Sequence, residues 1–368
     1  MTKAAVQLKA DGPIEFIEVD VRAPGPGEVR VRMAAAGLCH TDVQALYGGV
    51  AGMTMPPPVV AGHEGAGVVT EVGPGVSGPT VGDHVILSAM GHDGTCEFCT
   101  DGHPSLCLRS LQLADPRAGN GPALSVDGTS VTPFGPLGTF TEETIVPAEC
   151  AIAIDKAMPL DLACLIGCAV STGVGAVRNR VTIRPGDHVA VLGCGGVGLN
   201  IVQAARRAGA GSVIAVDVSE EKLAAATAFG ATHVIDARHV QVPDAVRAVT
   251  GPFGAHFTFE STGLTDCMAQ AISAARPGGT AVLLGMAPGS SALVLDNISE
   301  IILQEKVITG SLMGSGYSAR DFPVLVREYL EGTLKLDELI TRRRPLAEIN
   351  EAIADLKSGT GLRTVFTF

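Results

Sequence analysis

Short apolar runs separated by turn residues characterise the first 150 residues of this 368-residue chain. The clearest runs are Val29–Met33, Ala66–Val72 and His84–Leu87, and many Gly and Pro residues lie between them. Short runs rich in Val and Ile with turn residues between them are typical of antiparallel strands. We therefore expect the N-terminal part of the chain to form a β-rich unit.

A different pattern begins near residue 171 and continues to about residue 310, where runs of strand length alternate with stretches of helical length. The predicted strands are His188–Leu192, Ser212–Val216, His233–Ile235, Ala255–Phe259 and Thr280–Leu284, and the predicted helices are Gly198–Ala208, Glu220–Phe229 and Thr265–Ala275. This alternation indicates an α/β fold with a parallel, doubly wound sheet.

The tail of the chain predicts two further helices, Ala319–Glu331 and Leu346–Lys357, and a closing strand, Thr364–Phe368. We expect this tail to return to the first unit. The length of the chain also favours two domains over one. The predicted organisation is a catalytic domain of residues 1–170 and 311–368 and a dinucleotide-binding Rossmann domain of residues 171–310.

Charge and hydropathy exclude several function classes. The formal net charge is −12, whereas nucleic acids and anionic membranes are bound by basic surfaces. The one basic cluster, Arg342–Arg344, is interpreted as a solvated loop or helix end. The longest apolar stretches, such as Ala163–Val170, fall far short of the ~20 residues of a membrane span. Without a signal-peptide core after Met1, we expect a cytoplasmic protein with no nucleic-acid or membrane partner.

A glycine-rich segment at residues 193–198, Gly-Cys-Gly-Gly-Val-Gly, lies between a predicted strand and a predicted helix. In a dinucleotide-binding loop Gly193 allows the tight turn, Gly195 lets the backbone approach the pyrophosphate, and Gly198 permits close packing of helix on strand. Asp217 ends the next strand, where a carboxylate accepts hydrogen bonds from the ribose hydroxyls and repels a 2′-phosphate. No Arg follows it directly, so we predict NAD rather than NADP as the cofactor.

Cysteines in a cytoplasmic chain are more often metal ligands or buried side chains than disulfides. Three of the nine form a tight group between turn residues: Cys96, Cys99 and Cys107. This spacing predicts a thiolate metal site. Asp93 is the preferred fourth ligand, and His92 and His103 are rival candidates. The spacing of Cys39, His63 and Cys168 predicts nothing by itself.

The whole chain resembles the zinc-containing medium-chain dehydrogenases of the alcohol dehydrogenase superfamily. The motifs that carry the resemblance occur in the family order: residues 37–42 (GLCHTD), 62–67 (GHEGAG), the cysteine lobe up to Cys107, residues 167–173 (GCAVSTG), the loop 193–198, and residues 363–365 (RTV). Ordinary alcohol dehydrogenases and thiol-dependent formaldehyde dehydrogenases both look similar.

The resemblance implies a GroES-like catalytic domain with two zinc sites. Cys39, His63 and Cys168 would hold the catalytic zinc, and Asp93, Cys96, Cys99 and Cys107 the structural zinc. Glu64 would lie behind the catalytic metal, Asp42 would orient the His63 ring, and Thr41 would hydrogen-bond the substrate oxygen.

The resemblance also assigns residues to NAD. Thr172 and Val197 would lie near the nicotinamide, Lys222 near the adenosine ribose with Asp217, and His40 and Arg363 at the pyrophosphate. The remaining cysteines, Cys150, Cys164, Cys194 and Cys267, match no ligand position and are interpreted as buried or incidental.

Three positions depart from the family pattern. Asp93 stands where the family has its first structural cysteine. Gln44 stands where many members have a histidine at the end of the proton relay, and glutamine cannot take up a proton. Ala89 stands where relatives often have a bulky aromatic residue near the substrate, so we expect a roomy pocket that accepts substituted or aromatic alcohols.

The predicted function is a zinc-dependent alcohol dehydrogenase, a homodimer or homotetramer that moves hydride between a primary or secondary alcohol and NAD. The alternative is a thiol-dependent formaldehyde dehydrogenase, whose anionic substrate favours basic residues at the pocket rim, with Arg109 and Arg117 as candidates. A zinc-free enone or quinone reductase would have no use for Cys39, His63 and Cys168 together. A non-enzymatic NAD-binding protein would be expected to have lost a ligand or Thr41.

Overall fold

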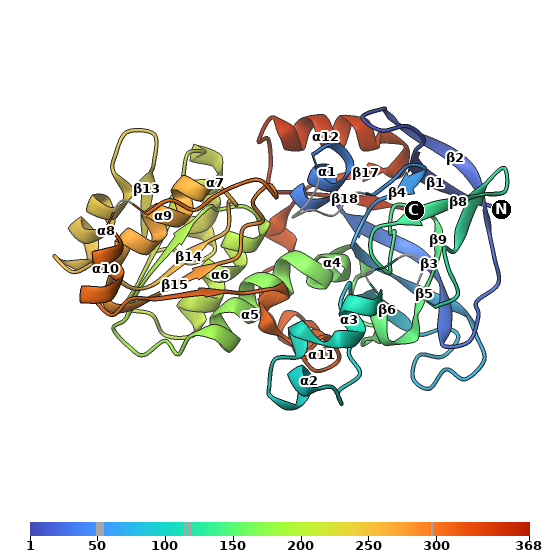
Figure 1. Cartoon of the computed structure of the whole chain (residues 1–368), viewed down its shortest axis with the longest axis horizontal. Coiled ribbons are helices and arrows are strands. Elements are labelled where there is room, and N and C mark those ends of the chain that lie inside the picture. Colours follow the sequence, from blue (N-terminus) through green and yellow to red (C-terminus); the bar gives the residue numbers. More distant parts are fainter. Residues whose placement is uncertain (49–54, 114, 116–118, 296) are drawn as a thin grey trace. The chain divides into compact units, whose positions relative to one another are not determined.

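A computed structural model describes residues 1–48, 55–113, 115, 119–295 and 297–368 (Figure 1). The chain folds into two compact units. Unit 1 comprises Met1–Ser171 and Gly316–Phe368, and unit 2 comprises Thr172–Ser315. The sequence prediction put the corresponding changes after residues 170 and 310.

Unit 1 is built on two sets of β-strands. Within the described residues, a closed barrel contains β1 (Thr2–Gln7), β2 (Ile14–Val21), β7 (Leu124–Val126), β8 (Thr129–Pro133) and β4 (Val59–Val60). A second sheet runs in the order β10 (Ala151–Ala153), β6 (His84–Leu87), β5 (Glu64–Val72), β3 (Glu28–Gly37), β18 (Arg363–Thr367) and β17 (Ile340–Pro345), with β9 (Glu143–Pro147) also paired to β3. The tail of the chain thus completes the sheet of unit 1.

Packing between these strands closes the core of unit 1. Phe140 and Phe366 have no exposed surface, and their rings meet edge to face with centroids 5.4 Å apart. Burial of one such side chain contributes about 1.5–3 kcal/mol. The helices of this unit are α1 (His40–Tyr47), α2 (Glu97–Thr100), α3 (Leu108–Leu113), α4 (Leu160–Leu165), α11 (Ser318–Leu330) and α12 (Ile349–Lys357).

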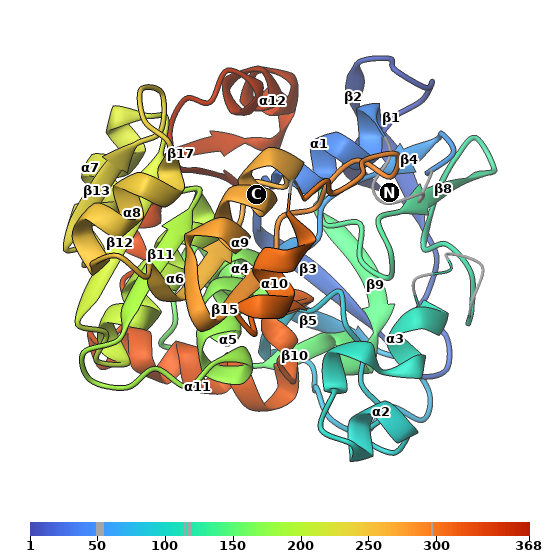
Figure 2. The same cartoon turned by 60° about the vertical axis from the view of Figure 1, so that its left-hand side comes forward.

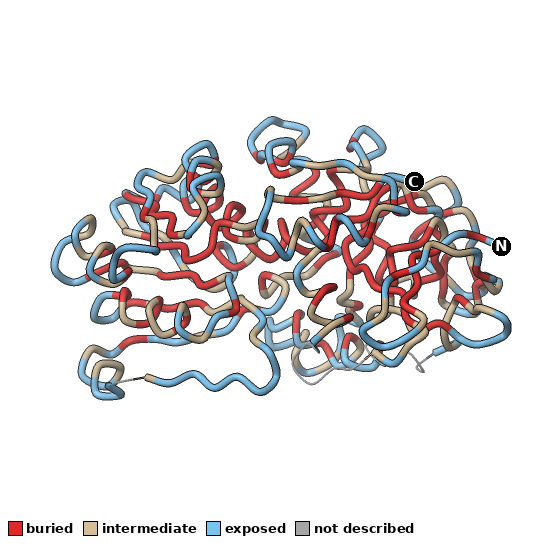
Figure 3. The backbone as a smooth tube through the Cα atoms, turned by 90° about the horizontal axis from the view of Figure 1, so that it is seen from above, coloured by how far each residue is buried: buried red, intermediate tan, exposed pale blue. Residues whose placement is uncertain are grey.

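Unit 2 is a doubly wound α/β unit, as the alternating pattern predicts (Figure 2). Its parallel sheet has the order β13 (His233–Asp236), β12 (Ser212–Asp217), β11 (His188–Leu192), β14 (Ala255–Glu260), β15 (Ala275–Leu283) and β16 (Val307–Gly310). Its helices are α5 (Ser171–Arg180), α6 (Gly196–Arg207), α7 (Glu220–Ala228), α8 (Val242–Thr250), α9 (Thr265–Ala274) and α10 (Ile298–Leu303). Figure 3 shows buried stretches of the chain in the interior and exposed stretches in the loops at the surface.

One helical segment, Leu160–Arg180, contains α4, a π-helical turn at Ile166–Val170, and α5. By length and composition it is apolar enough to cross a membrane, although 83% of its apolar window is buried inside the fold, as in the core helix of a globular protein. Gly167 lies in the π-helical turn, where a Cβ atom would be 2.7 Å from the carbonyl oxygen of Leu87 in β6. Glycine is therefore required for the turn to lie this close to the sheet.

The interpretation of Arg342–Arg344 as a solvated loop or helix end is wrong. These residues form part of strand β17, and all three are ion-paired. Nη2 of Arg343 lies 2.8 Å from Oδ2 of Asp161, and Nη2 of Arg344 lies 2.7 Å from Oδ2 of Asp355. Asp355 also pairs with Arg342. The cluster is thus compensated by acidic neighbours, of which Asp161 lies far from it in the sequence and Asp355 lies in the following helix α12.

Candidate active site

Asp42 ties two of the predicted metal ligands together at the end of β3. The chain leaves β3 at Gly37, and Cys39 then caps the N-terminus of α1. The fully buried carboxylate of Asp42 accepts hydrogen bonds from the N–H of Cys39 at 3.0 Å and of Gly62 at 3.1 Å, and lies 2.8 Å from Nδ1 of His63. An ionised carboxylate only accepts, so Nδ1 carries the proton and Nε2 is left free to bind a metal.

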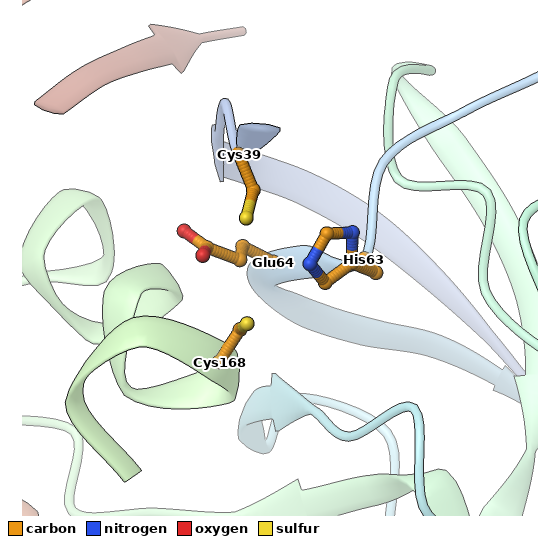
Figure 4. A group of neighbouring side chains, drawn as sticks. All are labelled: Cys39, His63, Glu64 and Cys168. Carbon is orange, nitrogen blue, oxygen red and sulfur yellow. The ribbon is translucent and has the colours of Figure 1, made fainter. Parts of the chain in front are cut away.

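Four side chains from three segments meet next to this carboxylate. The ligand atoms of Cys39, His63, Glu64 and Cys168 all lie within 4.8 Å of one another. In Figure 4 the two sulfur atoms and the imidazole ring face one another, whereas the Glu64 carboxylate points past them. Cys168 comes from the π-helical turn and the other three from the ends of β3 and β5.

The ligand side chains of this cluster shift one another's pKa values. The hydrogen bond between Cys168 and Cys39 lowers the pKa of Cys39 well below its usual value and raises that of Cys168. Burial by itself would lower the pKa of His63, but Asp42 raises it well above its usual value. Two thiols and one imidazole in a buried site match the protein ligands of a catalytic zinc, which keeps a fourth position open.

Glu64 and Arg363 form a buried ion pair behind the cluster. Burial raises the pKa of Glu64, while the charge of Arg363 opposes that shift. Within the described residues, Oε1 of Glu64 is buried without a hydrogen-bond partner, so it is available to a bound cation. Arg363 is only 6% exposed, and its predicted contact with the cofactor pyrophosphate stays a prediction.

The cysteine lobe brings together a second set of ligands. The ligand atoms of Asp93, Cys96, Cys99 and Cys107 lie within 4.8 Å of one another, with Cys96 Sγ 3.8 Å from Cys107 Sγ. Asp93 Oδ1 also accepts hydrogen bonds from the N–H groups of Thr95 and Cys96, at 2.7 and 2.9 Å. This donor set, three sulfur atoms and one carboxylate, can close a tetrahedral zinc site.

The two histidines near the lobe lie outside this group. His92 packs edge-on against Tyr317, and its Nδ1 lies 3.3 Å from the hydroxyl of Ser318. Burial lowers the pKa of His92. The backbone of His103 precedes a short 3₁₀ turn and donates to the carbonyl of Phe98. Among the three candidates for the fourth ligand, the structure therefore brings Asp93 to the cysteines.

In unit 2 the glycine-rich segment has the geometry of a dinucleotide-binding loop. Gly193 has a φ of +92°, and a Cβ atom on Gly198 would overlap the Gly193 carbonyl oxygen. A Cβ atom on Gly195 would meet no atom within 4 Å, so the backbone is open to a ligand there. Asp217 holds the loop, because its Oδ2 accepts the N–H of Cys194 at 2.7 Å.

The other predicted cofactor residues are distributed over both units. In unit 2 the hydroxyl of the buried Thr172 lies 3.8 Å from Met313 Sδ, and Val197 is half-buried. The backbone N–H of Lys222, in the first turn of α7, donates a hydrogen bond to the hydroxyl of Ser219, which caps this helix. In unit 1 His40 is exposed, and Gln44 lies in α1 and is partly buried.

Three pocket-related predictions have mixed outcomes. Ala89 follows β6 and packs against a core cluster of unit 1. Arg109 Nε is 2.8 Å from Glu149 Oε1, so its charge is already paired. Arg117 lies outside the described residues.

Sequence reasoning missed one aromatic contact at the cluster. Phe134 stacks on the His63 ring with centroids 4.8 Å apart and an interplanar angle of 27°. It follows β8 in a Gly- and Pro-rich stretch, where neither spacing nor periodicity marks it as a site residue.

Comparisons with known proteins identify the family of the chain. Residues 25–156 match the alcohol dehydrogenase GroES-like domain family, and residues 196–331 match the zinc-binding dehydrogenase family. The S-(hydroxymethyl)glutathione dehydrogenase of Saccharomyces cerevisiae is 36% identical over 98% of this chain and 95% of its own.

Two solved structures share the whole fold. An alcohol dehydrogenase zinc-binding domain protein from Burkholderia ambifaria has a TM-score of 0.93 at 36% identity, covering 100% of this chain and 98% of its own. Benzyl alcohol dehydrogenase from Acinetobacter calcoaceticus has a TM-score of 0.92 at 30% identity, covering 100% and 99%.

Proposed function

Because the chain belongs to the zinc-binding dehydrogenase family with an alcohol dehydrogenase GroES-like domain, we propose that Cys39, His63 and Cys168 form its catalytic zinc site. The chain is an NAD-dependent zinc alcohol dehydrogenase, which transfers hydride reversibly between an alcohol and NAD. The observation that supports the site assignment is the convergence of two sulfurs and one imidazole within 4.8 Å, with Asp42 holding Nδ1 of the imidazole.

Zinc held by Cys39, His63 and Cys168 would, when bound, stabilise negative charge on the substrate oxygen, and bound NAD would be the hydride acceptor. The protein has to hold the substrate and move its proton. Thr41 lies at the start of α1, with its hydroxyl 3.7 Å from Cys39 Sγ, and this position supports its role as hydrogen-bond partner of the substrate oxygen. Gln44 cannot ionise near neutral pH, so the proton must pass from Thr41 to water or another group.

NAD is expected at the glycine-rich segment of unit 2. The open backbone at Gly195 supports approach of the pyrophosphate, and the carboxylate of Asp217 lies at the end of β12, where the ribose hydroxyls are bound in this fold. We therefore expect a strong preference for NAD over NADP, which steady-state kinetics with both cofactors would measure. Comparable kcat/KM values for the two would contradict the role of Asp217.

The substrate class is proposed from the pocket. Ala89 replaces a bulky side chain that relatives often have, and a benzyl alcohol dehydrogenase shares the whole fold, so we favour substituted or aromatic alcohols. The similarity to the yeast S-(hydroxymethyl)glutathione dehydrogenase keeps a thiol adduct of formaldehyde as the second candidate. Arg109, one of the two basic residues that would favour that candidate, is paired with Glu149.

Assembly into a homodimer or homotetramer is supported by an apolar edge of unit 2. Strand β16 lies at the end of the parallel sheet and carries Val307, 50% exposed, and Ile308, 37% exposed. Neighbouring α10 adds Ile302 and Leu303, which are 67% and 82% exposed. An exposed apolar sheet edge is a common site of subunit association. A cytoplasmic location stays a prediction.

An alcohol and aldehyde panel tests the proposed function. We expect the protein to reduce NAD with benzyl alcohol and with secondary alcohols in the absence of thiol. The zinc content of the same protein sample is measured alongside its activity. Turnover of formaldehyde only in the presence of glutathione would favour the second candidate, and no turnover with any substrate would refute both. Cys168→Ala should lose activity and zinc but retain binding of 5′-AMP, because Cys168 lies in unit 1 and the glycine-rich segment and Asp217 lie in unit 2.

A further inference from the structure

An arginine lies next to the predicted ribose site although none follows Asp217 in the sequence. Strands β12 and β13 pair in parallel, with Asp217 opposite Asp236. The N–H of Ala237 donates to the Asp217 carbonyl at 3.0 Å, and Arg238 is the next residue. The sheet therefore brings Arg238 close to the carboxylate that is expected to bind the ribose hydroxyls.

Two carboxylates hold the Arg238 side chain. Its Nη2 lies 2.9 Å from Glu220 Oε1 and 2.5 Å from Asp236 Oδ2, and its Nε lies 3.0 Å from both oxygens of Asp236. The backbone N–H of Arg238 also donates to Asp236, at 3.0 Å. One partner comes from the end of β13 and the other from the first turn of α7, so the guanidinium bridges the two segments that flank Asp217.

The two segments around Asp217 and Arg238 carry a net negative charge. Residues 217–222 and 236–238 contain four acidic and two basic side chains. The hydrogen bond from Arg238 lowers the pKa of Asp236 to about 2, so this carboxylate is ionised at any pH at which the enzyme would be assayed. A 2′-phosphate would enter a field that repels it.

We propose that Asp236 and Glu220 act with Asp217 as determinants of cofactor specificity, by holding Arg238 so that it is not available to a 2′-phosphate. This inference rests on the proposed NAD-dependent function. Arginine is the preferred partner of phosphate because its planar fork donates two parallel hydrogen bonds. The chain therefore contains the cation that an NADP-binding protein needs, compensated by two neighbouring acids.

The exposure of these side chains makes the arrangement easy to alter. The side chains of Arg238, Asp236 and Glu220 are 43%, 31% and 84% exposed. Exposed ion pairs contribute little to stability, so neutralising one partner should weaken the hold on the guanidinium without unfolding the unit.

The test uses equilibrium binding of 5′-AMP and 2′,5′-ADP to the full-length, zinc-loaded protein. The background variant is Asp217→Asn, which keeps one acceptor oxygen for the turn at residues 218 and 219. In this background we expect Asp236→Asn to strengthen the binding of 2′,5′-ADP about tenfold relative to that of 5′-AMP. This change is the effect of one charge-assisted hydrogen bond to the phosphate. Asp236→Asn alone should have little effect, because Asp217 still repels the phosphate. NADP kcat/KM should follow the binding ratio.

Two controls separate the role of Arg238 from a general change in charge. Adding Arg238→Met to the double variant should abolish the gain. Asp161→Asn removes a carboxylate from Arg343, a pair of similar exposure at 48% and 30%, and should not change the ratio. A gain that survives Arg238→Met, an equal gain with Asp161→Asn, or no gain in a variant of normal melting temperature would overturn the inference. Absence of NAD-linked turnover in the wild type would instead refute the proposed function.

Discussion

Neutralising Asp42 should lower both the stability of unit 1 and its affinity for zinc. Three donors converge on this carboxylate: the N–H groups of Cys39 and Gly62 and Nδ1 of His63, at 3.0, 3.1 and 2.8 Å. Each buried donor left without an acceptor costs about 1–3 kcal/mol. In Asp42→Asn the remaining oxygen can serve Gly62 and His63, while the new amide faces the N–H of Cys39, so one donor is lost. Asp42→Ala loses all three.

The expected effects are therefore graded. Asp42→Asn should reduce the free energy of unfolding by about 1–3 kcal/mol, and Asp42→Ala by two to three times as much. Because Asp42 positions both Cys39 and the His63 ring, zinc affinity should fall about 10–100-fold in Asp42→Asn. Urea unfolding followed by circular dichroism measures the first quantity, and competition with a fluorescent chelator measures the second.

Glu28 provides a matched control in the same unit. It is also buried, at 8% exposed, and accepts hydrogen bonds from Arg22 and the N–H of Gly25. Glu28→Gln should destabilise the unit without changing its zinc affinity. Wild-type zinc affinity in Asp42→Asn, or an equal loss in Glu28→Gln, would refute the view that Asp42 acts by positioning the ligands.

Three further predictions follow from the sites described. Cys99→Ala should lower the melting temperature and speed loss of structure in chelator while leaving kcat nearly unchanged, because a structural zinc stabilises the folded lobe; a large loss of kcat at full stability would contradict this. Thr41→Ala should reduce kcat at least about 100-fold, and Gln44→Ala should reduce kcat little. Gln44→His should add an acid limb near pH ~6.5 to the pH–rate profile, and equal losses of kcat in the two alanine variants would contradict a relay that bypasses Gln44. Ile308→Lys should shift the protein to a smaller species in light scattering, and an unchanged mass would exclude β16 from the interface.

Periodicity predicted five strands of unit 2 but missed β16. The five predicted strands, from His188–Leu192 to Thr280–Leu284, all lie within or overlap observed strands. The strands in the middle of the sheet, β12, β11 and β14, are largely buried, as is typical of parallel sheets. Strand β16 is short and its two apolar side chains, Val307 and Ile308, are exposed. The opposite edge strand, β13, is also short and partly exposed, but the run His233–Ile235 was sufficient to predict it.

The functional sites differ in how far apart their residues lie in the sequence. The glycine-rich segment and the cysteine lobe each consist of residues that lie close together in the sequence, so their spacing could be interpreted. Cys39, His63 and Cys168 come from different elements, so only a family resemblance could group them. The ion pair of Arg238 with Glu220 depends on the alignment of a strand with a helix, which no local pattern encodes.

The discontinuity of unit 1 has a consequence for the order in which the chain folds during synthesis. Strand β18 pairs with β3, and Arg363 at its start meets Glu64, a residue 299 positions earlier in the chain. While residues 172–315 are being translated, β3 has not yet met β18, and Glu64 is buried or solvated without its counter-ion. Unit 2 is one continuous segment of the chain, so all of its strands have been synthesised before β17 and β18, and we expect it to fold before unit 1 is complete. The unit made first is thus completed last, and until then the thiols of Cys39 and Cys168 depend on the reducing conditions of their compartment or on early zinc capture.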